Sequence, residues 1–113
     1  MLKDTPPSTL AIFFVSIALI SPIIEEVAFR GMLQNALKKR ISTTFSILIT
    51  SCLFSFLHLS IHAGISNLPL FFSLFTFSCL LGFLYERQRS LFAPIGLHIM
   101  FNSINLVSIL FFK

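Results

Sequence analysis

Three long stretches without charge constrain the fold of this chain more than any other feature. Residues 5–24, 41–85 and 90–112 contain no Asp, Glu, Lys or Arg. A helix needs about 20 apolar residues to cross a bilayer, so the middle stretch is too long for one helix. Its segment "HAGISNLP" (62–69) carries Gly, Asn and Pro, which divide it in two. The pattern predicts an all-α fold, a polytopic transmembrane bundle with helices at about 9–38, 43–60, 68–86 and 91–112.

The composition also indicates a chain whose surroundings are lipid. It is 56% hydrophobic and 11% charged, whereas soluble domains contain about 25% charged residues. The net charge is +4, but the basic residues are clustered. Such clusters flank membrane spans on the cytoplasmic side, so they do not indicate nucleic-acid binding. The clustered residues are Lys38, Lys39, Arg40, Arg87, Arg89 and Lys113.

The first predicted helix is too long for a simple span. We expect it to bend near Gly31 and to finish as a separate amphipathic piece, "MLQNALKKR" (32–40). The pattern argues against a membrane barrel, because its strands would show apolar residues alternating with period two and the runs here do not.

Three charges interrupt the apolar sequence at Glu25, Glu26 and Arg30. Each charge costs roughly 2.5–3.5 kcal/mol at the centre of a membrane helix, so they require partners. Glu26 and Arg30 are four residues apart and share a helix face, where they can pair. Glu25 lies about 100° around the helix from Glu26. The spacing predicts that Arg30 neutralises Glu26 and that Glu25 faces another helix.

Two other segments offer polar partners for Glu25. His58 follows Phe54 by four residues, and His98 precedes Asn102 by four. A carboxylate, two imidazoles and an amide are suited to hydrolysis. Glu25 could take a proton from water as a general base, with His58 orienting that water. His98 and Asn102 could donate hydrogen bonds to the oxyanion that forms on a peptide carbonyl.

The patterns E-E-x-x-x-R, F-x-x-x-H and H-x-x-x-N occur in this order, on separate predicted helices. Together they resemble the CAAX prenyl protease and bacteriocin-processing (CPBP, or Abi) family of intramembrane proteases, over about residues 21–105. The resemblance implies a membrane endopeptidase. It implies catalytic roles for four residues and structural support from three. The catalytic residues are Glu25, His58, His98 and Asn102, and the supporting residues are Glu26, Arg30 and Phe54.

The resemblance leaves the metal question open. A metal-free mechanism that depends on a glutamate is favoured, and zinc is the alternative. Glu25, His58 and His98 would then form a two-His, one-carboxylate ligand set with an open position. The sequence contains no H-E-x-x-H motif.

Other functions remain open at this stage. The chain could act without proteolysis, as a bacteriocin self-immunity factor or a membrane partner protein, or as a small transporter with Glu25 as its proton-coupling carboxylate. As a protease it would act on a peptide or membrane protein, either prenylated or a bacteriocin leader. The expected location is the bacterial cytoplasmic membrane.

The chain is expected to form one domain over residues 1–113. Members of the family commonly have additional helices before the first motif. The sequence is therefore either a fragment or a minimal version that oligomerises or tolerates an open flank.

The predicted topology conflicts with a shared site. If both basic clusters lie on one side of the membrane, straight helices place His98 about 10 Å and His58 about 25 Å from that side. A common site then requires a strongly tilted second helix or a deeper 38–40 segment. Two further polar residues are assigned no catalytic role: His62 is expected at the interface, and Asn105 in helix packing.

Overall fold

One continuous helix dominates the molecule. The computed structural model describes residues 4–59 and 67–111. Within this part of the chain all regular structure is helical. The first helix runs for 32 residues, from Pro7 to Lys38. Its segments are α1 (Pro7–Val15), η2 (Ser16–Ile20), α2 (Ser21–Glu26), η3 (Val27–Gln34) and α3 (Asn35–Lys38).

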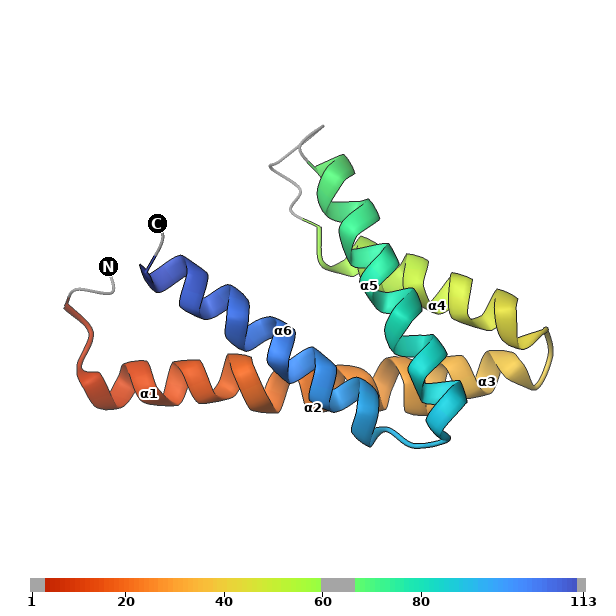
Figure 1. Cartoon of the computed structure of the whole chain (residues 1–113), viewed down its shortest axis with the longest axis horizontal. Coiled ribbons are helices and arrows are strands. Elements are labelled where there is room, and N and C mark those ends of the chain that lie inside the picture. The colour runs from red at the N-terminus through yellow and green to blue at the C-terminus, as the bar shows by residue number, and fades with distance from the viewer. Residues whose placement is uncertain (1–3, 60–66, 112–113) are drawn as a thin grey trace.

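The expected bend near Gly31 is wrong. Figure 1 shows α1, α2 and α3 in one line, and the wider π-helical turns of η3 carry the chain through Gly31 without a break. The polar residues after Gly31 do not form a separate piece, because α5 (Asn67–Gln88) binds them. Gln34 donates to the Gly82 carbonyl at 3.4 Å, and Asn35 donates to the Tyr85 hydroxyl at 2.6 Å.

The other three helices begin close to the predicted positions. These are α4 (Thr43–Leu57), α5 and α6 (Phe92–Phe111). Ser42 caps α4, because its side chain accepts a hydrogen bond from the Phe45 amide at 3.2 Å. α4 ends before the predicted residue 60. Nδ1 of His58 lies 2.6 Å from the carbonyl oxygen of Phe54. The backbone amide of His58 donates to the carbonyl of Ser55, three residues earlier, so the α-helical pattern ends here.

The packing of α6 resolves the predicted difference in depth. That prediction assumed straight helices that all start at the membrane surface carrying the basic clusters. In the structure α5 packs against α4 and η3, whereas α6 packs against α5 and also against η2 and α2, nearer the start of the first helix. Figure 1 shows that the turn after α5 runs back along the first helix, so α6 begins near its middle. His98 is thereby brought level with Glu25.

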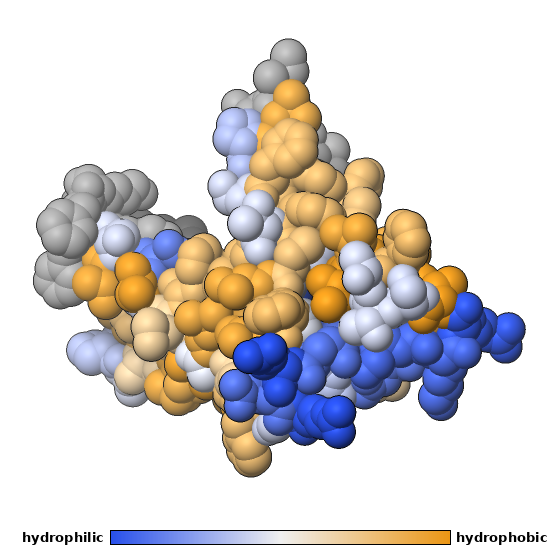
Figure 2. Space-filling model, turned by 45° about the vertical axis from the view of Figure 1, so that its right-hand side comes forward, coloured by the Kyte–Doolittle hydropathy of each residue, from blue (hydrophilic) through white to orange (hydrophobic). Residues whose placement is uncertain are grey.

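The interior of the bundle is polar and its exterior is apolar. Glu26, Arg30 and Gln34 lie one turn apart along the first helix, and each is fully buried. Most of the large apolar side chains are exposed, and Figure 2 shows them covering much of one face, with hydrophilic residues gathered at one end. The remaining buried polar residues are Ser46, Thr50, Ser51, Ser55, Ser78 and His98. A bundle that folds in lipid has this arrangement, since polar groups there point inward.

Helix lengths agree with a membrane location. Pro7–Lys38 and Asn67–Gln88 are long and apolar enough to cross a bilayer, and Thr43–Leu57 and Phe92–Ser108 are shorter apolar helices. The predicted all-α membrane fold is confirmed.

Candidate active site

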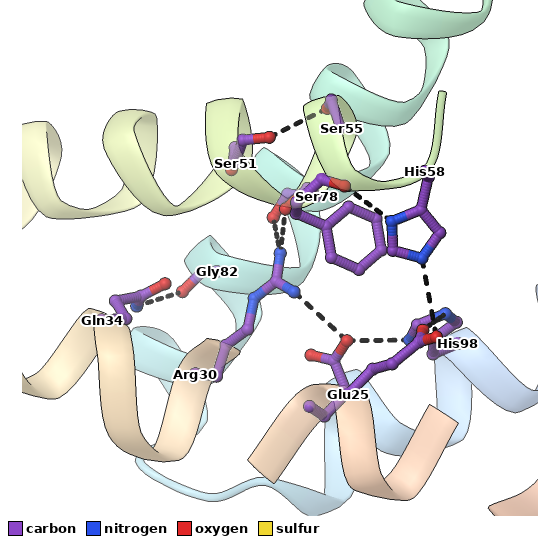
Figure 3. A network of polar contacts seen from close by, with 11 residues as sticks. Glu25, Arg30, Gln34, Ser51, Ser55, His58, Ser78, Gly82 and His98 are labelled. Carbon is purple, nitrogen blue, oxygen red and sulfur yellow. Dashed lines mark hydrogen bonds and ion pairs between the residues drawn. The ribbon is translucent and has the colours of Figure 1, made fainter. Parts of the chain in front are cut away.

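The carboxylate of Glu25 lies between two imidazoles. Its Oε2 is 3.5 Å from Nε2 of His58, and its Oε1 is 3.3 Å from Nε2 of His98. In Figure 3 the two histidines approach the carboxylate from different helices. Ser21, one turn earlier, donates its hydroxyl to Oε2 at 3.4 Å. The structure thus brings together three residues that are widely separated in sequence.

Phe54 fixes the ring of His58. The two rings stack with centroids 4.3 Å apart, and Nδ1 of His58 is 2.6 Å from the Phe54 carbonyl oxygen. A carbonyl can only accept, so Nδ1 carries hydrogen and Nε2 is the nitrogen that faces Glu25. Phe54 is buried, and its ring also lies under the guanidinium of Arg30 at 5.2 Å.

His98 contacts both glutamates of the motif. Its Nδ1 is 2.8 Å from Oε2 of Glu26, and its Nε2 faces Glu25. An imidazole that faces two carboxylates can donate to both only when both of its nitrogens carry hydrogen. The contact with Glu26 was not predicted, because spacing within one helix says nothing about which residue of a distant helix will lie beside it.

Arg30 holds Glu26 and crosses to α5. Its Nη1 donates to Oε2 of Glu26 at 3.2 Å, as the four-residue spacing predicts. Its Nη2 donates to both the backbone carbonyl and the hydroxyl of Ser78. Ser78 is a single small residue in an apolar helix, and no sequence signal distinguishes it. The Glu26–Arg30 pair is fully buried, so these hydrogen bonds offset the cost of removing the charges from water.

A pocket of about 180 Å³ opens over the Glu25 carboxylate. Its lining includes all four residues expected to be catalytic, and among them Asn102 lies one turn beyond His98 on α6. The remaining lining residues, except Phe54, were not predicted, because one Phe or Leu among many carries no distinguishing signal. The lining residues are Ser21, Glu25, Phe54, His58, Leu74, Phe77, His98, Phe101 and Asn102.

Asn105 and His62 were assigned no catalytic role. Asn105 is exposed on α6 and is not part of the pocket lining. His62 lies outside the described residues.

Glu25, His58 and His98 are the three side chains that could hold zinc. Within the described ranges 4–59 and 67–111, no three His, Cys, Asp or Glu side chains form a metal-binding group. The Glu25 carboxylate lies between the histidines, and each Nε2 faces a different carboxylate oxygen. No catalytic step is therefore derived through a metal.

Fold and site together define a polytopic helical membrane protein with a carboxylate–histidine pocket. The family model described as "Type II CAAX prenyl endopeptidase Rce1-like" matches residues 7–104. A Bacillus subtilis (strain 168) protein named "Putative membrane peptidase YdiL" is 33% identical over 87 residues, which are 76% of this chain and 32% of that protein.

The chain therefore belongs to the type II CAAX prenyl endopeptidase Rce1-like family, and the resemblance to CPBP proteases is confirmed at that level. It is an integral membrane protein. It spans about a third of the length of the curated relative that it matches. No solved structure gives a significant match.

Proposed function

We propose that this chain is a peptidase that hydrolyses peptide bonds within the membrane, with Glu25 as the base that activates water. The observation that carries the proposal is the position of the Glu25 carboxylate, between two imidazoles and at the wall of a pocket. Family membership supports the same reaction class.

The proposed reaction begins with water beside Glu25. The carboxylate takes one proton while the water oxygen attacks the carbonyl carbon of the substrate, and His58 orients the water. A tetrahedral intermediate forms, with a negative charge on the former carbonyl oxygen. When the C–N bond breaks, Glu25 returns its proton to the leaving nitrogen. The products are a carboxylic acid and an amine.

His98 and Asn102 are proposed to stabilise the oxyanion. Both residues line the pocket, and they lie one turn apart on α6. Removing one oxyanion donor typically slows an enzyme by about 10²–10³-fold. Glu26 has a positioning role here. Its Oε2 lies 2.8 Å from Nδ1 of His98, and this contact holds the ring with Nε2 facing the pocket.

The substrate is proposed to be a peptide or membrane protein of the bacterial cytoplasmic membrane. Four of the nine pocket-lining residues are aromatic or aliphatic, which suits an apolar segment next to the scissile bond. Prenylated peptides and bacteriocin leader peptides are the two kinds to test first, because the family model is named for prenyl endopeptidases and the resemblance extends to bacteriocin processing.

The decisive experiment is cleavage by the purified protein in lipid, with the wild type and Glu25→Gln compared. A prenylated peptide and a peptide library serve as substrates. Glu25→Gln keeps the size of the side chain and removes the base, so cleavage should fall by at least about 100-fold. Ser73→Ala, an exposed change on α5, is the matched control and should retain full activity.

A chelator distinguishes the two mechanisms. Cleavage that requires Glu25 and survives the chelator supports the metal-free mechanism. Cleavage that is lost to the chelator and restored by zinc would contradict it and make Glu25, His58 and His98 metal ligands. A folded protein that cleaves neither substrate would contradict the proposed peptidase function and favour an immunity or partner role.

A further inference from the structure

A second group of polar residues lies at the end of the molecule opposite the free ends of α1 and α6. Two hollows adjoin there. One, of about 350 Å³, is lined mostly by polar groups, from Lys38, Thr43, Tyr85, Glu86 and Arg89. The other, of about 420 Å³, is mostly apolar and includes Leu91, Phe92 and Ile95. Tyr85 and Arg89 line both, so a polar hollow passes into an apolar one across these two side chains.

This end of the molecule carries almost all of the excess positive charge. It holds five of the eight Lys and Arg residues and one of the four acidic residues, a net of +4 that equals the charge of the whole chain. Figure 2 shows the hydrophilic side chains gathered there beside the apolar face. The basic residues are Lys38, Lys39, Arg40, Arg87 and Arg89, and the acid is Glu86.

The one acidic side chain is already neutralised. Glu86 accepts from Lys38 at 2.7 Å through Oε1 and from Gln34 at 2.8 Å through Oε2. Both of its oxygens accept a hydrogen bond, and the charge of Lys38 offsets its repulsion of an anion in the polar hollow.

Hydrogen-bond donors remain available at the junction of the two hollows. The guanidinium of Arg89 makes no ion pair or side-chain hydrogen bond within the described chain, and its fork of N–H groups matches two oxygens of one phosphate. Asn35 donates to the oxygen of Tyr85, so the phenolic hydrogen is left to donate. Arg89 also has φ 52°, a left-handed conformation that is unfavourable for a residue with a side chain.

We infer that these adjoining hollows bind an anionic phospholipid, with the phosphate held by Arg89 and Tyr85 and the first part of an acyl chain on Leu91, Phe92 and Ile95. A free phosphate would fill only the polar half, whereas a lipid fits both. The basic cluster is on the expected cytoplasmic side, where anionic lipid headgroups attract Lys and Arg.

The test counts lipids bound to the full chain by native mass spectrometry during titration. Phosphatidylglycerol is compared with phosphatidylcholine of the same acyl chains, and inorganic phosphate is added as a competitor. Arg89→Gln should weaken phosphatidylglycerol binding by about five- to tenfold. Lys39→Gln is the matched control, because it removes the same charge from the same end but lines neither hollow. It should weaken binding less than about threefold.

Tyr85→Phe provides a second test if Arg89→Gln does not fold, because it removes only one hydroxyl. It should also weaken phosphatidylglycerol binding, with phosphatidylcholine binding unchanged. Equal binding of the two lipids, or equal loss in Arg89→Gln and Lys39→Gln, would overturn the proposal. Full displacement of the lipid by inorganic phosphate would show a simple anion site and would also overturn it.

Discussion

At the scale of single residues, the two adjacent glutamates have different surroundings. Glu26 is fully buried and contacts Arg30 and His98, while Glu25 faces the pocket. The helical spacing was sufficient to predict that Arg30 pairs with Glu26 and that Glu25 turns elsewhere. It was not sufficient to predict the contact with His98 or the anchoring of Arg30 on Ser78. Those contacts depend on how distant helices pack, which no local pattern encodes.

We predict that Glu26→Gln lowers stability, whereas Glu25→Gln does not. The neutral amide leaves the charge of Arg30 uncompensated in the interior, which costs about 3 kcal/mol. The melting temperature of the purified protein should fall for Glu26→Gln and stay near the wild-type value for Glu25→Gln.

Peptide cleavage should also distinguish the role of Glu25 from that of Glu26. Glu26→Gln should retain measurable cleavage at low temperature, because the base is intact and only the orientation of His98 is impaired. If both variants were equally inactive and equally stable, the two glutamates would share one role and this assignment would be wrong.

At the scale of helices, the sequence predicted the number and positions of the elements, because apolar length and the Gly, Asn and Pro of segment 62–69 are local signals. It did not predict close approaches. Gly82 on α5 lies against the first helix and α4. A Cβ added there would be 2.8 Å from Oε1 of Gln34 and 3.1 Å from Cγ2 of Ile47. The approach also allows Gln34 to reach the Gly82 carbonyl.

We predict that Gly82→Ala destabilises the bundle. The added methyl forces Gln34 and Ile47 to move, and overpacking of this kind costs about 1–3 kcal/mol. Gly96→Ala on α6 is the matched control, because its Cβ would meet nothing within 4 Å. That change should be neutral or stabilising, since Ala favours a helix over Gly by about 1 kcal/mol. Thermal unfolding in the same detergent measures both, and a more stable Gly82→Ala would show that this contact is loose.

At the scale of the whole molecule, the distribution of charged residues predicts how the bundle is oriented in the membrane. The turn after the first helix and the turn after α5 meet at one end, because Lys38 bonds Glu86 at 2.7 Å. The sequence placed both basic clusters on one side of the membrane. It left the relative depth of His58 and His98 in conflict with a shared site, because the direction of the turn before α6 is a tertiary feature.

Cysteine labelling from each side of the membrane checks this orientation. In a variant without Cys52 and Cys79, single cysteines at Lys39→Cys and Arg87→Cys should react with an impermeant maleimide from the same side, the cytoplasmic one. Phe83→Cys, exposed on the apolar surface of α5, is the control and should remain unlabelled from both sides. Labelling of the first two from opposite sides would contradict the arrangement of the turns.

The spacing of the Glu26–Arg30 pair has a consequence for how the chain enters the membrane. Both charges belong to one helix and lie one turn apart, so each has its counter-ion before any other helix arrives. The first helix can therefore insert with this pair already neutralised. Glu25 has only the hydroxyl of Ser21 within its own helix and reaches the histidines after α4 and α6 have packed. Glu25 therefore enters the membrane with the first helix and gains its histidine contacts only when the pocket is assembled.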